Sequence, residues 1–248
     1  MEEKRITIII PAYNESENLP KVLPRFVPIC ADLSSMNYET EILVINDGSS
    51  DNTEEIALQL GAKVISHPFN LGYGASLQTG YRYADRAKSQ IVVTIDADGQ
   101  HNPEDILKLL RVFIQNDDDV VIGSRFIQKS NYKISIMKKI GVNLFSFVAK
   151  LLTNKKIYDV TSGFQVIKRE PMLFLMDDFP HDYPDVEIII LLTKSGYKIE
   201  EVQVTMNQRI SGKSMHTFLS SIKYPFRSII AIIVVLLKHF MAIKRGKK

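Results

Sequence analysis

Short runs of β-branched residues alternate with helical segments through the first 125 residues, and this alternation limits the fold more than any other feature of the sequence. Strands separated by helices of this length form βαβ units, in which successive strands lie parallel. We therefore expect an α/β fold with a mainly parallel sheet flanked by helices. The predicted strands are residues 5–10, 41–45, 63–66, 91–95 and 119–122, and the predicted helices are residues 16–33, 51–60, 73–87 and 103–115.

Polar and glycine-rich residues follow each of the five predicted strands. Ligands of open parallel sheets bind outside the carboxyl ends of the strands, so chemistry is expected in these five loops. The loops read Pro11-Ala12-Tyr13-Asn14-Glu15, Asn46-Asp47-Gly48-Ser49, Asn70-Leu71-Gly72-Tyr73-Gly74, Asp96-Ala97-Asp98-Gly99-Gln100 and Gly123-Ser124-Arg125.

Two acidic residues, Asp96 and Asp98, flank one small residue directly after an apolar strand. Carboxylates at this spacing can hold one hard divalent cation, Mg²⁺ or Mn²⁺, and leave positions open for phosphate oxygens. Gln100 offers a further neutral oxygen. Asp47 has two open interpretations, as a hydrogen-bond acceptor for a base or ribose or as a turn residue in the sequence Asn-Asp-Gly.

The segment Gly72-Tyr73-Gly74 imitates a dinucleotide-binding fingerprint, because it follows a strand, opens a helix and precedes Asp96 by about 20 residues. The third glycine of that fingerprint is missing, since Leu77 stands in its place. Asp96 is also better explained together with Asp98. The sequence therefore argues against a nicotinamide or flavin enzyme.

The net charge of +3 conceals a separation of charges along the chain. Residues 120–158 contain eight Lys or Arg, residues 202–248 contain nine, and all 28 acidic residues lie outside these two blocks. Blocks of one sign indicate an anionic substrate or surface. The acidic remainder and the lack of a basic-aromatic platform argue against a nucleic-acid partner. A single cysteine excludes a disulfide framework and a multi-cysteine zinc site.

Nine consecutive apolar residues, 229–237, lie between Arg227 and Lys238. A helix of this length is too short to span a bilayer, whose hydrocarbon core is about 30 Å thick. The surrounding Lys and Arg residues favour a helix in the headgroup region of an anionic membrane surface. A buried terminal helix, or docking on a small transmembrane partner, would give the same pattern. The apolar run at the N-terminus ends at Pro11 and is too short for a signal peptide, so we expect a peripheral protein on the cytoplasmic face of the cell membrane.

Taken in order, the motifs resemble family 2 of the inverting glycosyltransferases. The resemblance covers residues 5–215, and it continues beyond the five loops through Thr161-Ser162-Gly163-Phe164-Gln165 and Arg209-Ile210-Ser211-Gly212-Lys213-Ser214. These two motifs are most similar to the branch that contains dolichyl-phosphate mannose synthase and bacterial polyprenyl-phosphate sugar transferases. The resemblance implies a glycosyltransferase A fold, with a Rossmann-like sheet, and a catalytic domain over residues 1–215. Residues 216–248 would then form a basic and apolar helix for a membrane interface or a partner.

The resemblance also implies roles for individual residues. The nucleotide-sugar donor would contact Pro11, Ala12, Tyr13, Glu15, Asp47, Asp96 and Ser214. The cation would be held by Asp96, Asp98 and Gln100. Asp98 and Arg209 would be catalytic, with Arg209 on a mobile loop that closes over the donor diphosphate. The acceptor phosphate would meet Arg125, Lys129, Lys133, Lys138 and Lys139.

The chain departs from that branch in two places. Many members carry transmembrane helices after the catalytic domain, whereas this chain has one short apolar segment. Members often have two acidic residues at the end of the second strand, whereas this chain has Asn46 before Asp47, so no role is assigned to Asn46.

The expected reaction transfers a sugar, with inversion, from a nucleotide-sugar donor to a polyprenyl phosphate. The cation and Arg209 would stabilise the charge of the departing nucleoside diphosphate. A phosphate acceptor has a second pKa of about 6 and needs no strong base. A sugar hydroxyl, as in surface polysaccharide synthesis, would need a carboxylate base, and Asp185 or Glu187 is the candidate. The same acidic pair could instead orient Arg209 or Lys213.

Two further expectations concern a non-catalytic function and the histidines. A non-catalytic, membrane-recruited module that binds nucleotide sugars is a third interpretation, which the intact Asp96 and Asp98 disfavour. His101 and His181 could lie near the metal, but the favoured expectation is that they are partly exposed and have no special role.

Overall fold

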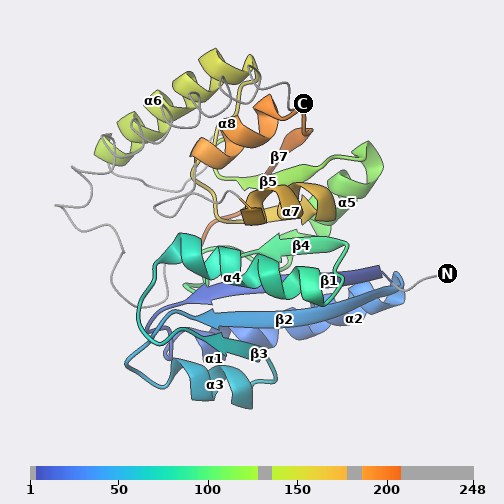
Figure 1. Cartoon of the computed structure of the whole chain (residues 1–248), viewed down its shortest axis with the longest axis vertical. Coiled ribbons are helices and arrows are strands. Elements are labelled where there is room, and N and C mark those ends of the chain that lie inside the picture. Colours follow the sequence, from blue (N-terminus) through green and yellow to red (C-terminus); the bar gives the residue numbers. More distant parts are fainter. Residues whose placement is uncertain (1–3, 128–135, 178–185, 208–248) are drawn as a thin grey trace.

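A seven-stranded sheet of order β3-β2-β1-β4-β6-β5-β7 runs through the middle of the structure (Figure 1). The structure is a computed structural model and describes residues 4–127, 136–177 and 186–207. In these ranges β6 pairs antiparallel with β4 and β5, and the other strand pairs are parallel. The strands are β1 (Lys4–Ala12), β2 (Tyr38–Asn46), β3 (Lys63–Ser66), β4 (Ile91–Thr94), β5 (Val120–Ser124), β6 (Gln165–Lys168) and β7 (Ile199–Gln203).

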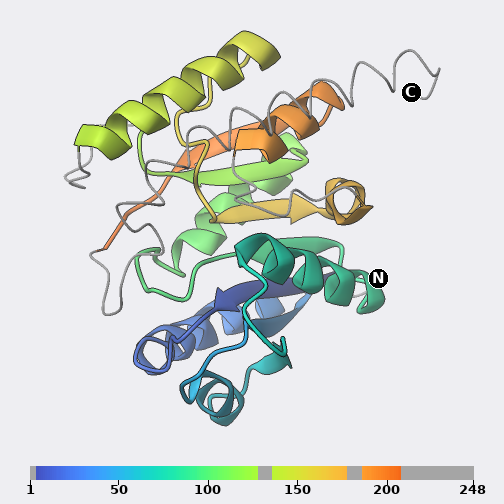
Figure 2. The ribbon, with the colours of Figure 1, turned by 60° about the vertical axis from the view of Figure 1, so that its left-hand side comes forward.

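Helices cover both faces of this sheet, as the two views in Figures 1 and 2 show. The helices are α1 (Leu19–Val22), the 3₁₀ turn η1 (Leu23–Arg25), α2 (Phe26–Ser35), α3 (Thr53–Gln59), α4 (Tyr73–Arg86), α5 (Asp105–Asn116), α6 (Ile136–Thr153), α7 (Arg169–Asp177) and α8 (Val186–Lys194). The predicted mainly parallel sheet flanked by helices is therefore confirmed.

The period-two pattern of β1 divides the interior into two apolar layers. Ile6, Ile8 and Ile10 point to one face and pack with side chains of α1, α2 and α5, whereas Ile9 points to the other face and packs with α4 and α7. A strand that is apolar on both faces must lie inside a sheet covered on both sides. The run of isoleucines therefore fixes β1 near the centre of the molecule.

The single helix predicted over residues 16–33 is divided into α1, η1 and α2. Pro20 and Pro24 stand in the first turns of α1 and η1, where a missing backbone N–H costs no intrahelical hydrogen bond. Each proline thus favours a new start of the helix. The prediction was right about helical structure and wrong about its continuity.

In the part of the chain that the structure describes, no helix combines the length and the apolar character that crossing a bilayer requires. The predicted segment 216–248 lies outside the described residues.

Candidate active site

The strand order reverses between β1 and β4. Strands β2 and β3 lie on one side of β1, and β4 lies on its other side. Ligands of open α/β sheets bind at such a reversal, outside the carboxyl ends of the strands. Pro11 and Ala12 end β1, and the segment with Asp96 and Asp98 follows β4 directly. The arrowheads of β1 and β2 in Figure 1 mark this edge of the sheet. The fold therefore brings the first and fourth predicted loops to neighbouring positions.

Hydrogen bonds hold the loop after β4 in place. Asp98 is only 5% exposed, and its Oδ1 accepts a hydrogen bond of 2.9 Å from the backbone N–H of Gln100. The carbonyl of Gln100 accepts one of 2.8 Å from the N–H of Asn207, and His101 forms an antiparallel bridge with Met206. The acidic loop is thus fixed against the segment that follows β7.

Gly163, two residues before β6, leaves room for the Asp96 carboxylate. A Cβ atom on Gly163 would lie 3.0 and 3.3 Å from the two carboxylate oxygens of Asp96 and 2.4 Å from the hydroxyl oxygen of Tyr73. The hydroxyl of Thr94 donates a hydrogen bond of 2.7 Å to the carbonyl of Gly163 and anchors it at the end of β4. Asp96 therefore occupies space that a side chain at position 163 would fill.

The chemistry of this loop fits a divalent cation. Asp96 and Asp98 offer carboxylate oxygens and Gln100 offers an amide oxygen, all hard donors of the kind that Mg²⁺ and Mn²⁺ prefer. Among the described residues, no group of three or more His, Cys, Asp or Glu side chains could hold a metal ion. Two carboxylates suit an ion that shares its coordination with phosphate oxygens of a substrate.

Asp47 organises the loop between β3 and α4. Its Oδ1 accepts a hydrogen bond of 2.8 Å from the N–H of Leu71, and its Oδ2 accepts one of 2.9 Å from the N–H of Gly72. The Nδ1 atom of His67 lies 2.7 Å from Oδ1, and the Nε2 atom of His67 lies 2.9 Å from the hydroxyl of Thr79. The Asp47 carboxylate thus accepts hydrogen bonds from backbone N–H groups before α4. A dinucleotide-binding loop would offer such N–H groups to phosphate. This geometry agrees with the sequence argument against such a loop.

The loop after β1 is tied to the loop after β2. Asn14 adopts a left-handed conformation with φ +55°, and its N–H donates a hydrogen bond of 2.9 Å to the hydroxyl of Ser49. The N–H of Glu15 donates one of 2.8 Å to the hydroxyl of Thr53. Tyr13 is 44% exposed beside them. The N–H of Asp47 donates a hydrogen bond of 2.8 Å to the carbonyl of Ala12. The predicted nucleoside-binding residues therefore share one edge of the sheet. Their contacts with a nucleoside stay a prediction.

Arg125, predicted to meet an acceptor phosphate, is 7% exposed and forms a buried ion pair with Asp159. Its Nη2 also donates a hydrogen bond of 2.8 Å to the hydroxyl of Thr161. The sequence reasoning missed Asp159, although it is the acidic residue that directly follows the basic block 120–158. The pair joins the end of β5 to the segment that leads to Gly163. A contact between Arg125 and an acceptor stays a prediction.

His101 is buried against Phe164, with ring centroids 5.1 Å apart, so its expected partial exposure was wrong. Burial lowers the pKa of His101 to about 3, and the positive charge of Arg125 acts in the same direction. The imidazole is therefore neutral at physiological pH.

The remaining predicted site residues are less fully described. Glu187 is buried in the first turn of α8. The predicted residues that lie outside the described part of the chain are Lys129, Lys133, His181, Asp185, Arg209 and Ser214, together with the side chains of Lys138 and Lys139.

Comparison with known proteins identifies a family and several relatives. The family described as Glycosyl transferase family 2 matches residues 7–174. A UDP-N-acetylglucosamine–dolichyl-phosphate N-acetylglucosaminyltransferase of Methanococcus voltae is 31% identical over 224 residues, covering 82% of this chain and 86% of the relative. A polyprenol monophosphomannose synthase of Mycolicibacterium smegmatis is 27% identical over 222 residues, covering 85% of this chain and 80% of the relative.

A solved structure supports the fold. Glucosyl-3-phosphoglycerate synthase of Mycobacterium tuberculosis, in complex with Mn²⁺, UDP and glucosyl-3-phosphoglycerate, superimposes with a TM-score of 0.65 at 21% identity. The match covers 95% of this chain and 80% of that structure. The glycosyltransferase A fold expected from the motifs is therefore confirmed. Since the family match spans well over half of the chain, the protein belongs to glycosyltransferase family 2 and is a glycosyltransferase.

Proposed function

We propose that the protein transfers a sugar from a nucleotide-sugar donor to a polyprenyl phosphate, with a divalent cation and with inversion, at the cytoplasmic face of a membrane. The observation that carries the proposal is the position of Asp96 and Asp98 directly after β4, where the strand order reverses, beside the loop after β1. This is the point at which an α/β sheet binds nucleotides.

The donor would lie across this edge of the sheet. Tyr13, Glu15 and Asp47 line the side where β1 and β2 end, which suits a nucleoside. Asp96, Asp98 and Gln100 would hold Mg²⁺ or Mn²⁺, and the bound cation would neutralise the charge that develops on the leaving diphosphate. The hydrogen bond from the N–H of Gln100 orients the carboxylate of Asp98 before substrate arrives, and Gly163 leaves room for that of Asp96.

The transfer itself is a single displacement. An oxygen of the acceptor phosphate forms a bond to the anomeric carbon while the bond from that carbon to the donor diphosphate breaks. The nucleoside diphosphate leaves with the electron pair, and attack from the opposite side inverts the anomeric centre. A phosphate with a second pKa of about 6 is already an anion, so this step needs no strong base from the protein.

Three observations support a lipid-linked acceptor. Curated relatives that match more than four fifths of this chain are named as transferases acting on dolichyl phosphate or as a polyprenol monophosphomannose synthase. The block 120–158 is basic and free of acidic residues, which suits an anionic acceptor. Phe147 and Leu151, one turn apart on α6, are 64% and 73% exposed, which suits contact with a lipid chain or a membrane surface.

The test is a transfer assay with a panel of radiolabelled nucleotide sugars, Mg²⁺ or Mn²⁺, and a polyprenyl phosphate in detergent. Label that enters the organic phase supports the proposal. The matched control is the polyprenol without its phosphate, which should accept no sugar because its hydroxyl would need a base.

Other results of the same assay would contradict the proposal. Label on water-soluble glycans would indicate a hydroxyl acceptor and a role for Asp185 or Glu187. Label on 3-phosphoglycerate, added as a soluble phosphate acceptor, would show that the lipid chain is not recognised. Donor binding without any transfer would indicate a non-catalytic module.

A further inference from the structure

The outer side of α6 carries two large apolar side chains that face solvent. Val142, Phe145 and Ala149 are buried and recur at helical spacing, so they mark the side by which α6 packs against its neighbour α8. Phe147 and Leu151 stand one turn apart on the opposite side and are 64% and 73% exposed. Figures 1 and 2 show α6 at the end of the molecule opposite to α3. The packing of α6 thus leaves an apolar strip at one end of the molecule.

Exposed cations accompany this strip. Lys150 follows Phe147 by three residues on the outer side of α6 and is exposed. Phe147, Lys150 and Leu151 together are called the α6 surface. The segment that leaves this end of the helix adds Lys156 and Tyr158, both exposed, with the Nζ atom of Lys156 4.1 Å from the centre of the Tyr158 ring. Apolar, aromatic and basic side chains therefore alternate along this stretch of the chain.

Negative charge close to this end of α6 is either absent or paired. Residues 120–158 contain no acidic residue. Asp159 is buried and forms the ion pair with Arg125. The exposed carboxylate of Glu200 on β7 lies 3.7 Å from the Nζ atom of Lys155. The charge around the α6 surface is therefore positive, which favours an anionic partner.

A lipid bilayer fits this combination of side chains better than another protein does. Protein interfaces are depleted of lysine and take about 20–30 residues from each partner, far more than the few exposed here. At a bilayer, apolar side chains enter the region below the headgroups, and lysine side chains extend to the lipid phosphates. Tyrosine is enriched at the same depth.

Hydrogen bonds connect α6 to the candidate active site. The hydroxyl of Ser146 donates to the carbonyl of Ile157. Two residues later, the N–H of Asp159 donates a hydrogen bond of 2.8 Å to the carboxylate of Glu201 on β7. Asp159 in turn holds Arg125, the residue predicted to meet the acceptor phosphate. A membrane bound at α6 would therefore have a fixed position relative to Arg125.

We propose that the α6 surface docks on an anionic lipid membrane, with Phe147 and Leu151 below the headgroups and Lys150 at the lipid phosphates. The inference deepens the proposed function, on which it rests for the lipid acceptor, by naming the part of the folded domain that meets the membrane. A single weak contact gives only marginal membrane binding, so the α6 surface and the predicted segment 216–248 would act together.

The experiment measures sedimentation of the full chain with vesicles of phosphatidylcholine, with and without phosphatidylglycerol. One variant, Phe147→Ser with Leu151→Ser, removes the apolar strip, and another, Lys150→Gln with Lys156→Gln, removes two cations. All four positions are exposed, so circular dichroism and the melting temperature should match those of the wild type.

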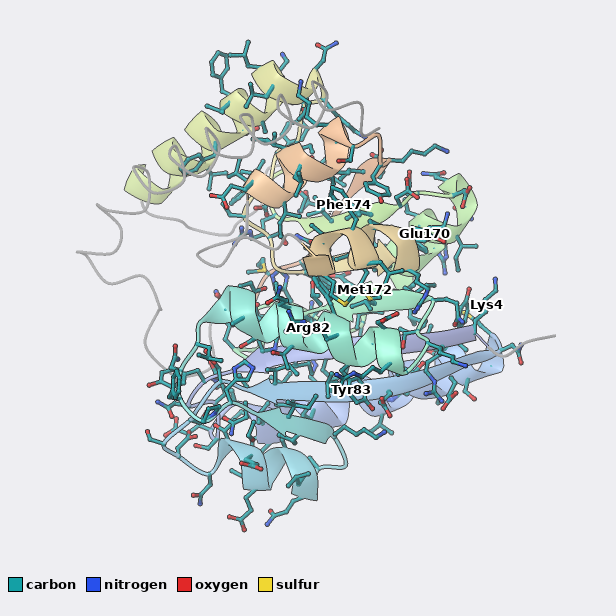
Figure 3. All side chains as sticks on the ribbon, in the orientation of Figure 1. Lys4, Arg82, Tyr83, Glu170, Met172 and Phe174 are labelled. Atoms are coloured by element: carbon teal, nitrogen blue, oxygen red, sulfur yellow. The ribbon has the colours of Figure 1, made fainter. Side chains whose placement is uncertain are left out.

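The matched controls change exposed residues elsewhere. Val27→Ser with Leu58→Ser removes two exposed apolar side chains from α2 and α3. Lys21→Gln with Arg82→Gln removes two exposed cations, and Figure 3 shows Arg82 on α4, which α7 and α8 separate from α6. Both controls should bind vesicles as the wild type does.

We expect loss of Phe147 and Leu151 to weaken binding to both kinds of vesicle by about tenfold or more. Loss of the two lysines should weaken binding to anionic vesicles by about tenfold or more and leave binding to neutral vesicles unchanged. Wild-type binding by the Phe147→Ser, Leu151→Ser variant would overturn the inference, as would an equal loss in the controls or no binding by the wild type.

Sedimentation needs neither donor nor acceptor, so a loss confined to the α6 variants supports the inference even if the wild type transfers no sugar to a polyprenyl phosphate. Transfer to a polyprenyl phosphate by variants that still bind vesicles fully would overturn the inference and leave the proposed function intact. Analytical ultracentrifugation tests a second copy as the partner. A wild-type dimer that dissociates in the Phe147→Ser, Leu151→Ser variant, with unchanged vesicle binding, would overturn the inference in favour of an interface between copies.

Discussion

Arg125 and Asp159 form a two-point ion pair in the interior of the protein, with Nε 2.6 Å from Oδ2 and Nη2 2.6 Å from Oδ1. The backbone N–H of Arg125 also donates a hydrogen bond of 2.9 Å to Oδ2. The carboxylate of Asp159 is fully buried and the side chain of Arg125 is 8% exposed, so the pair joins the end of β5 to the segment before β6 in the interior.

Loss of this pair should destabilise the fold strongly. In Asp159→Asn the guanidinium remains buried without a counter-charge, and we expect the free energy of unfolding in urea to fall by about 3–5 kcal/mol. The matched control is Glu39→Gln, which breaks the exposed pair with Arg5 and should change that free energy by about 1 kcal/mol or less. Equal losses in the two variants would contradict a structural role for the Arg125–Asp159 pair.

The buried His101 predicts a dependence of stability on pH. Its pKa is about 3 in the folded protein and 6.5 as a model value, so below pH 6.5 the unfolded chain binds a proton that the folded protein does not. Its contribution to stability is present above pH 6.5 and is lost as pH falls from 6.5 toward 3. Between pH 7 and pH 5 this amounts to about 2 kcal/mol.

The variant His101→Phe isolates this contribution from that of the carboxylates. Urea unfolding at pH 7 and at pH 5 should show a smaller loss of stability in the variant than in the wild type, by that amount. The same pH dependence in both proteins would show that the pKa of His101 does not differ between the folded and the unfolded state.

The central strands and the edge that carries the site follow from the sequence. Isoleucine and valine runs with no charged residue inside them identify β1 and β4, and the motifs after them lie at the reversal of strand order. β6 and β7 were not predicted. β6 is four residues long, and β7 contains the adjacent charged residues Glu200 and Glu201, which interrupt the apolar pattern that predicts a strand.

Contacts between side chains that are far apart in the chain could not be predicted from the sequence. Asp47 has the appearance of a turn residue, and its bonds to His67 and to the amides before α4 depend on how β2 and β3 pair. Asp159 and Gly163 acquire their partners only when β6 inserts antiparallel between β4 and β5. Periodicity and spacing carry no information about such pairings, since they arise from topology.

Replacement of Asp47 should loosen the loop before α4. Asparagine offers one acceptor oxygen where the carboxylate offers two, so the N–H of Leu71 or of Gly72 loses its partner. We expect Asp47→Asn to lower the free energy of unfolding by about 1–3 kcal/mol. Hydrogen exchange at residues 67–72 should rise relative to exchange in α5. Unchanged exchange in that loop would show that Asp47 does not hold it.

Removal of residues 217–248 tests the predicted membrane segment. The truncated protein should remain in the supernatant when vesicles containing anionic lipid are sedimented, whereas the full chain should sediment with them. Vesicles of neutral lipid serve as the control and should retain less of the full chain. Sedimentation of the truncated protein with anionic vesicles would place membrane binding elsewhere, and the exposed face of α6 would then be examined through Phe147 and Leu151.

The central claim is that the Asp96–Asp98 loop binds the divalent cation on which sugar transfer depends. The most direct measurement compares the Mn²⁺ dependence of sugar transfer by the wild type and by Asp98→Ala, at equal folded fractions established by circular dichroism. We expect the wild type to require the cation, and the variant to lose activity by about a hundredfold or more at every Mn²⁺ concentration while it stays folded. Transfer by Asp98→Ala at the wild-type rate, or transfer by the wild type in EDTA, would contradict the claim.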